Sequence, residues 1–336
     1  HLEHRRQRQM CIRDRGRSTK AELIMPLPGE TTETFVAGLN NILNSNASSL
    51  TIYTLMMLNG TEFKNPDFRK KYGYQGKYRI VPLNFGEYAG ERVFDVEEVG
   101  IATKDMSFKE YISLRVLALL VESLHNGKPF NEFFKYAKNF KIEPGTLLKI
   151  MNDNISNASN KIQEIINGFI EETKGELWDS EKELVDHYKK DENYVKLKEG
   201  KVGGNLIYKY KSKNLVEAST DWIDFFEKQL FLEIKNKQIL AINYDAIKAE
   251  LSEISKFNKL KLNGLLNPKA NTQAIEDKFR FDILGWIDEL DNNKLLKEYE
   301  CDSISLKKIK FEFTKNQIMN RDDVFKRYGK LSLIHI

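Results

Sequence analysis

The sequence predicts an α/β protein in which a strand–helix–strand unit precedes a mainly helical region. Residues 21–27 form an apolar run that ends in a Pro/Gly turn, and an amphipathic helical pattern follows it. Residues 49–57 form a second apolar run rich in β-forming side chains. Beyond residue 104, apolar side chains recur mainly at the spacing of a helix face.

The first strand is expected over residues 21–27, and the helix after it begins at Thr31 or Thr32, whose hydroxyl groups suit an N-cap. One face of this helix carries its apolar side chains: Phe35, Leu39, Ile42 and Leu43. With residues 49–57 as the second strand, the segment is expected to be a right-handed βαβ unit with parallel strands. Two strands cannot close a barrel, so we expect the unit to begin deep inside a larger α/β domain.

A long aromatic segment comes next, after a turn at Asn59-Gly60-Thr61. Residues 65–89 are rich in tyrosine, phenylalanine and glycine, and we expect them to form a loop. Loops of this length are usually functional. A further strand is expected over residues 92–103.

The helical region begins at a capping box formed by Ser107 and Glu110. The pattern predicts a first domain over residues 17–103, made of the βαβ part and the aromatic loop, and a mainly helical domain over residues 104–330. In the second domain, helices are expected after the capping box and over residues 129–140, 144–174 with a polar break, 175–190, 219–237 and 244–258. Strands are expected over residues 205–211, 279–286 and 308–313, with a last helix through Tyr328.

Composition restricts the classes of function. The chain has 53 basic and 49 acidic residues and a net charge of +4, so charge does not indicate nucleic-acid binding. No apolar run reaches about 18 residues, so we expect no membrane span. The two cysteines, Cys11 and Cys301, are too few for a disulfide framework or a four-thiolate metal site. We therefore expect a cytoplasmic protein that does not bind nucleic acid.

The two ends of the chain differ from the rest. Residues 1–16 are dense in arginine and histidine without periodicity, and residues 331–336 break off in mid-pattern. Residues 10–15 and 331–336 resemble translated sequencing-adapter read-through, a contaminant of assembled environmental DNA. The alternative for the N-terminal stretch is a disordered basic tail. We expect the genuine chain to begin near Arg17 and to be open at both ends.

The turn after the first strand is the first candidate site. Ligands of parallel α/β sheets bind at the carboxyl ends of strands, beside helix N-termini. Gly29 allows a ligand to approach the backbone there, and Glu30 lies where a negative charge suits the helix dipole. A helix start that needs no ligand has the same residues, so the turn alone does not decide between the two.

The segment Leu23–Thr34, written LIMPLPGETTET, resembles the strand-five motif of the radical S-adenosylmethionine (radical SAM) superfamily. The resemblance implies that Leu27, Pro28, Gly29 and Glu30 lie against the adenine of the cofactor. Pro26 stands where the motif often has its first glycine. Residues 51–55 are similar to strand six of the same barrel, which implies cofactor contacts for Tyr53 and Leu55.

Later segments resemble the cobalamin-binding branch of that superfamily. They are residues 68–73, 78–82 with 85–88, 97–99 with Thr103, and Tyr111 with Arg115. The resemblance implies the last part of a partial TIM-type (β/α)6 barrel, with S-adenosylmethionine, a [4Fe–4S] cluster and cobalamin as cofactors of the intact protein. Candidates for the substrate side are Arg79, Tyr88 and Glu97, although Arg79 could equally pair with a nearby carboxylate.

One departure from the superfamily is large. Its CxxxCxxC cluster motif is absent, because Cys11 lies in the suspected read-through and Cys301 stands alone. We therefore expect a C-terminal fragment of the enzyme, inactive by itself, and no metal ligands in this chain, His125 and His187 included. The resemblance implies a small-molecule substrate for the intact enzyme. The alternatives are a radical SAM enzyme without cobalamin, acting on a small molecule or a peptide, and a non-catalytic helical interaction module.

Overall fold

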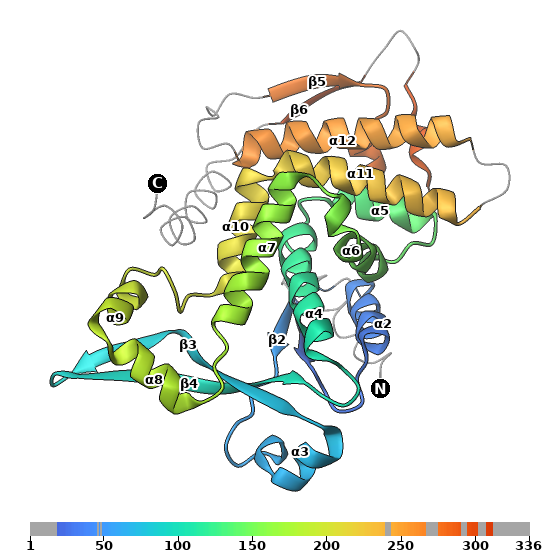
Figure 1. Ribbon diagram of the computed structural model, residues 1–336. Helices are drawn as coiled ribbons and strands as arrows, with labels where there is room; N and C mark the ends of the chain where they lie inside the picture. Colours follow the sequence, from blue (N-terminus) through green and yellow to red (C-terminus); the bar gives the residue numbers. More distant parts are fainter. Residues whose placement is uncertain are drawn as a thin grey trace. The chain divides into compact units, whose positions relative to one another are not determined.

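The structure is a computed structural model that describes residues 19–45, 47, 49–238, 243–266, 275–289, 294–301 and 307–311. Over these residues the protein is mixed α/β, with helices predominating (Figure 1). The described strands form three separate two-stranded sheets and no closed barrel. Both chain ends, Cys11 and the expected helix through Tyr328 lie outside the described residues.

The chain divides into two compact units. Of the described residues, unit 1 contains 19–122 and 165–211, and unit 2 contains 123–164 and 212–311. Each unit therefore draws on two stretches of the chain. The domain boundary expected between residues 103 and 104 marks a change in the predicted secondary structure along the chain, not a division by contacts. It stays a prediction.

Unit 1 begins with the βαβ arrangement that the sequence predicts. Strand β1 (Lys20–Met25) pairs in parallel with β2 (Ser49–Thr54), and helix α2 (Thr32–Leu43) connects them. Thr31 is the N-cap of α2, and its hydroxyl group accepts a hydrogen bond from the Thr34 N–H group. The expected apolar face of α2 is buried along Phe35, Leu39 and Leu43.

The prediction of a loop over residues 65–89 is wrong, because most of this segment forms a helix and a strand. A short 3₁₀ turn (Glu62–Lys64) leads into helix α3 (Pro66–Tyr72), and strand β3 (Gln75–Tyr88) follows. Strand β4 (Glu91–Ala102) confirms the strand expected there and pairs with β3 in an antiparallel hairpin.

Glycines concealed this strand because they interrupt the apolar alternation. At Gly76 an added Cβ atom would lie 2.1 Å from Glu98 Oε1, so the glycine serves close packing in the hairpin. Ala89 and Gly90 turn the chain with φ angles of 52° and 82°. Two positive φ angles in a two-residue loop are typical of a type I′ hairpin turn.

Helices α8 (Glu181–Lys189) and α9 (Asp191–Lys198) also belong to unit 1, where α8 packs on the hairpin (Figure 1). A buried cluster joins Ile80 of β3 to Leu184, Tyr188, Tyr194 and Leu197 of the two helices. The helix expected over residues 175–190 is shorter than predicted, because α8 begins only at Glu181. Trp178 and Tyr78 exchange two backbone hydrogen bonds of 2.8 Å ahead of it.

The capping box of Ser107 and Glu110 is confirmed at the start of α4 (Phe108–Leu120), which continues into a π-helical turn (Val121–His125). The strand expected over residues 205–211 is wrong, because this segment begins helix α10 (Leu206–Glu217). Apolar residues and lysines alternate at the end of this segment with the two-residue period of a strand. The side-chain oxygen of Asn205 accepts a hydrogen bond from the Tyr208 N–H group, which is typical of an N-cap.

Unit 2 is mainly helical, and α11 and α12 lie side by side in it (Figure 1). Its largest buried side chains include Trp222, Phe226 and Phe133. Besides part of α7 (Asn160–Gly175) and of α10, its elements are α5 (Asn131–Asn139), α6 (Pro144–Asp153), a 3₁₀ turn (Ile155–Asn157), α11 (Ser219–Asn236), α12 (Tyr244–Leu266), β5 (Ile275–Phe279), α13 (Ile283–Asp288), a 3₁₀ turn (Leu296–Tyr299) and β6 (Lys307–Phe311).

Strands β5 and β6 pair antiparallel, so β6 agrees with the strand expected near residue 308. The strand expected over residues 279–286 is wrong beyond Phe279. Asp282 accepts a hydrogen bond from the Gly285 N–H group and starts α13, so a local cap overrides the apolar run.

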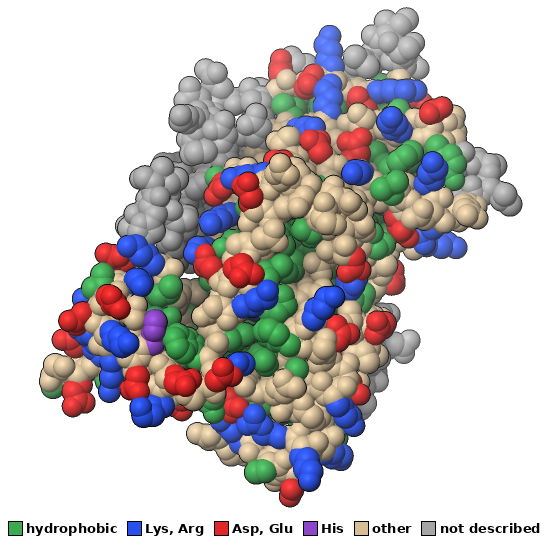
Figure 2. All heavy atoms as spheres, in the orientation of Figure 1, with side chains coloured by type: hydrophobic (Ala, Val, Ile, Leu, Met, Phe, Trp, Pro, Cys, Tyr) green, Lys and Arg blue, Asp and Glu red, His purple; other side chains and the backbone are tan. Residues whose placement is uncertain are grey.

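The described residues lack membrane-spanning helices and carry mixed surface charge. None of their helices combines the length and apolar character needed to cross a membrane. Figure 2 shows basic and acidic side chains interspersed on the face that it presents. This mixing agrees with the near balance of charges in the sequence.

Candidate functional site

The turn after β1 closes through its own residues. Gly29 adopts a left-handed conformation with φ of 75°. The Glu30 N–H group donates to the Leu27 carbonyl oxygen, and the Leu27 N–H group donates to Glu30 Oε2, both at 3.2 Å. Burial raises the pKa of Glu30, and its hydrogen bond from Leu27 opposes the increase in part. Glu30 therefore has a structural partner already.

The outer side of the same turn is open. Leu27 is 38% exposed, and a Cβ atom added to Gly29 would have no heavy atom within 4 Å. A flat group could therefore approach the backbone between Leu27 and Gly29, with Pro28 between them half-buried. The expected contact residues 27–30 are close in space because they form one turn.

Tyr53 and Leu55, the other expected cofactor contacts, have different surroundings. Leu55 is buried in a cluster with Met57 and Tyr74. Tyr53 is 47% exposed and lines a cavity beside β2. Of the two side chains, Tyr53 is therefore the one that faces a space where a ligand could bind.

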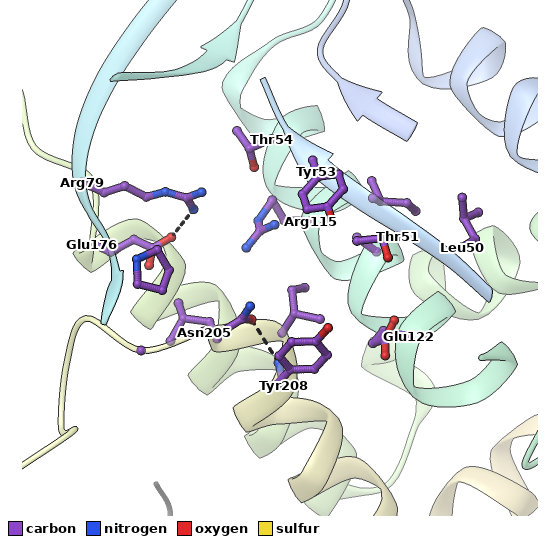
Figure 3. A pocket seen from close by; sticks show the side chains of 16 residues that line it. Leu50, Thr51, Tyr53, Thr54, Arg79, Arg115, Glu122, Glu176, Asn205 and Tyr208 are labelled. Atoms are coloured by element: carbon purple, nitrogen blue, oxygen red, sulfur yellow. Dashed lines mark hydrogen bonds and ion pairs between the residues drawn. The ribbon is translucent and has the colours of Figure 1, made fainter. Parts of the chain in front are cut away.

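This cavity has a volume of about 220 Å³ and lies within unit 1 (Figure 3). Strand β2, strand β3, helix α4 and the start of α10 form its walls, together with Glu176. Its polar and aromatic lining includes Thr51, Tyr53, Arg79, Arg115, Glu122, Glu176, Asn205 and Tyr208.

Arg79 forms one wall through two ion pairs. Its Nε atom lies 2.6 Å from Glu97 Oε1, across the hairpin, and its Nη1 atom lies 2.9 Å from Glu176 Oε1. Burial lowers the pKa of Arg79, but the negative charges of Glu176 and Glu97 outweigh that effect and raise it. The Arg79 guanidinium group is therefore held in its charged form between the two carboxylates.

The three expected substrate-side residues do not converge. Arg79 lines the cavity, Glu97 is buried behind it as its cross-strand partner, and Tyr88 is 71% exposed at the far end of β3. The pairing of Arg79 with carboxylates is the alternative that the sequence left open.

In the sequence, Arg115 is named only as part of a resembling segment and is not among the candidate site residues. Its side chain comes from α4, the residue is only 6% exposed, and its Nε atom has no hydrogen-bond partner among the described residues. The guanidinium carbon lies 5.9 Å from the centre of the Phe169 ring. Figure 3 shows the guanidinium group pointing into the space between Tyr53, Glu176 and Asn205.

The start of α10 forms the opposite wall. The first N–H groups of a helix have no acceptor within the helix, so those of Leu206 and Ile207 are directed away from its body. Gly203 and Gly204 precede the Asn205 cap, and Gly203 has a φ angle of 71°. The Gly-Gly-Asn sequence is a helix-start signal that could have located this wall.

The cavity also contains a carboxylate with its own partner. Glu122 Oε1 lies 2.7 Å from Lys211 Nζ. Both carboxylates of the lining, Glu122 and Glu176, therefore have cationic partners other than Arg115.

No protein-family model matches the chain, and no curated protein matches it at a significant level. The function must be argued from the residues and their geometry.

Metal ligands do not gather in the described residues. No group of three or more His, Cys, Asp or Glu side chains there is arranged to hold a metal ion. Cys301 has the carbonyl oxygen of Tyr299 as its neighbour, with 4.0 Å between Sγ and O. The described residues therefore do not fit a [4Fe–4S] cluster, which needs several thiolates.

Proposed function

We propose that this chain is part of a radical S-adenosylmethionine enzyme of the cobalamin-binding branch, and that unit 1 contributes walls for the cofactor and for a small-molecule substrate. The observation that carries the proposal is the parallel unit of β1, α2 and β2, with the turn of residues 27–30 after the carboxyl end of β1. That is the place where ligands of parallel sheets bind.

The open outer side of the turn supports a role in binding the adenine of S-adenosylmethionine. Leu27 offers exposed apolar surface, and Gly29 leaves room for a ring against the backbone. Glu30 holds the turn closed and keeps this surface in place. The chain's part in the reaction is thus to orient the cofactor.

In this superfamily, S-adenosylmethionine bound at a reduced cluster supplies the radical that starts the reaction, and cobalamin can supply a methyl group. The described residues supply neither cluster ligands nor a cobalamin site that we can assign, and we derive no step through those groups. The cavity beside β2 is the place proposed for the substrate, with Tyr53 and Arg79 in its walls.

The gene upstream provides the first test. We expect it to encode CxxxCxxC about a hundred residues or more before Leu23, roughly the length of the missing strands and helices of such a barrel. A gene without that motif would contradict the proposal. A gene with the motif but no cobalamin-binding domain would favour a cobalamin-free enzyme.

The longer protein provides the second test. After anaerobic reconstitution with iron and sulfide, we expect iron–sulfur absorbance and 5′-deoxyadenosine on reduction with S-adenosylmethionine. Leu27→Asp should raise the S-adenosylmethionine concentration needed for half-maximal product, whereas Leu232→Asp, an equally exposed position on α11, should not. A protein with neither absorbance nor product would support the helical interaction module instead.

A further inference from the structure

We propose that the cavity of unit 1 binds an oxyanion, a carboxylate or a phosphate monoester, carried by a small molecule, and that Arg115 is its main partner. The inference deepens the proposed function by naming the chemical class of the substrate. It rests on that function only for calling the ligand a substrate.

Arg115 stands apart from the other arginines of the described residues. The other four each form an ion pair with a carboxylate within 3 Å: Arg69 with Glu98, Arg79 with Glu97, Arg92 with Asp191 and Arg280 with Glu300. Arg115 has no such pair with a carboxylate of the described part of the chain, although it is more than nine-tenths buried. Leaving the buried Nε–H group of a charged guanidinium without an acceptor is unfavourable. An anion in the cavity would remove that cost.

The carboxylates already in the cavity do not take this role. Glu176 lies 2.9 Å from Arg79, and Glu122 lies 2.7 Å from Lys211. Each of these carboxylates has an ion-pair partner other than Arg115, so neither is paired with its guanidinium group.

The start of α10 lies in the wall of the same cavity. This helix has twelve residues, and its N-terminus carries a partial positive charge. The N–H groups of Leu206 and Ile207 are available there. A Cβ atom added to Gly204 would have no heavy atom within 4 Å, so a ligand can approach this backbone closely. A guanidinium fork together with a helix N-terminus is suited to a carboxylate or a phosphate.

The size and remaining walls of the cavity limit the ligand. A volume of about 220 Å³ is below the range of about 300–1,000 Å³ of drug-sized sites, so the ligand is a small metabolite. Glu122 and Glu176 would repel a second anionic group. Tyr53 and Ile52 provide apolar surface for the rest of the molecule. The geometry therefore favours a compact ligand with one anionic end.

The test is an anion titration of the full chain at constant ionic strength, with inorganic phosphate and acetate as separate probes and sodium chloride as the compensating salt. We expect saturable binding by calorimetry and a rise in the unfolding temperature that sodium chloride does not produce. Stronger binding of phosphate would indicate a phosphate monoester, and stronger binding of acetate a carboxylate. No saturable binding of either probe would overturn the inference.

Variants assign the binding to this cavity. Arg115→Met should weaken it by about tenfold or more, because a charge-assisted hydrogen bond is lost, and Arg115→Lys should weaken it less. Arg280→Met removes the same charge from unit 2 and should leave affinity unchanged. Unchanged affinity in Arg115→Met would overturn the inference.

A second pair of variants tests the helix N-terminus. Proline is tolerated at the first helical position, so Leu206→Pro removes one N–H group without breaking α10. Leu206→Ala loses the same packing but keeps the N–H group. Weaker binding in Leu206→Pro than in Leu206→Ala supports the inference, and equal affinity contradicts the part assigned to α10.

Failure of this inference differs from failure of the proposed function. A gene without the upstream cysteine motif would remove the radical SAM assignment and leave the anion titration as it is. Absence of Arg115-dependent binding would remove the anion site and leave that assignment untouched.

Discussion

The hydroxyl group of Tyr74 donates a hydrogen bond of 3.0 Å to the carbonyl oxygen of Pro26. This bond joins the segment before β3 to the last residue before the turn at Leu27, and both partners are buried. Burial and the charge of Glu30 raise the pKa of Tyr74, so the hydroxyl group keeps its proton under ordinary conditions. The bond holds the candidate cofactor turn in position.

Tyr74→Phe should therefore destabilise the protein. The change leaves a buried carbonyl oxygen without its donor, at a cost of about 1–3 kcal/mol. Urea unfolding followed by circular dichroism measures the loss. Tyr72→Phe is the matched control, because the Tyr72 hydroxyl group forms no hydrogen bond with the described residues and that side chain is half-exposed. Equal effects of the two changes would contradict the role given to Tyr74.

The elements that the sequence predicted correctly have local signals. Thr31 caps α2, and Ser107 with Glu110 starts α4, because the capping atoms lie within three residues of each other. The parallel pairing of β1 and β2 also followed from the order of strand, helix and strand. Such features need no knowledge of the rest of the fold.

The errors have tertiary causes. Gly76 reads as a loop residue, but its missing side chain makes room for Glu98 inside the hairpin. The error at residues 205–211 is the exception, because its alternating residues suit a strand but a local feature, the Asn205 cap, decides for a helix. The lack of a partner for Arg115 depends on where every nearby carboxylate lies, which no spacing along the chain reveals.

The ion pairs of Arg79 should be important for stability. Arg79→Met leaves the buried carboxylate of Glu97 and that of Glu176 without their cation, so we expect a loss of about 3–5 kcal/mol in the free energy of unfolding. Changing both carboxylates to glutamine in the same chain should recover part of the loss. Chemical denaturation of the single and triple variants checks both statements.

The control for Arg79 is Arg92→Met. Arg92 pairs with Asp191, whose side chain is 90% exposed, so solvent screens the pair and its loss should change stability little. A larger loss in Arg92→Met than in Arg79→Met would contradict the assignment of the buried pairs as the important ones.

The exposed side of the β1–β2 sheet should promote self-association. Ile24 and Tyr53 are adjacent in the register and are 43% and 47% exposed, and β1 pairs only with β2 among the described strands. An exposed apolar edge strand is a site of aggregation. Ile24→Lys should therefore raise solubility, measured by light scattering against concentration, whereas Ile24→Val should not. We also expect faster amide exchange in residues 20–57 than in the helices of unit 2, and slow exchange there would contradict an open edge.

Acid should destabilise unit 2 through His125. Burial, together with the nearby charge of Lys128, lowers the pKa of His125 to about 4 from an ordinary value of 6.5. The Phe134 ring lies 5.1 Å away and contributes to this burial. Because the folded protein holds the imidazole neutral, the unfolded chain binds more protons between these two pKa values. Stability is thus complete above about pH 6.5 and falls as the pH is lowered toward 4.

The size of this effect follows from the two pKa values. Between pH 8 and pH 5 the histidine should cost about 2 kcal/mol of unfolding free energy, a range chosen because most carboxylates remain charged in it. His125→Gln cannot titrate and should lose correspondingly less stability over the same range. Urea unfolding of both proteins at pH 8 and pH 5 gives the difference directly. The same loss in both would mean that groups other than His125 cause the acid sensitivity.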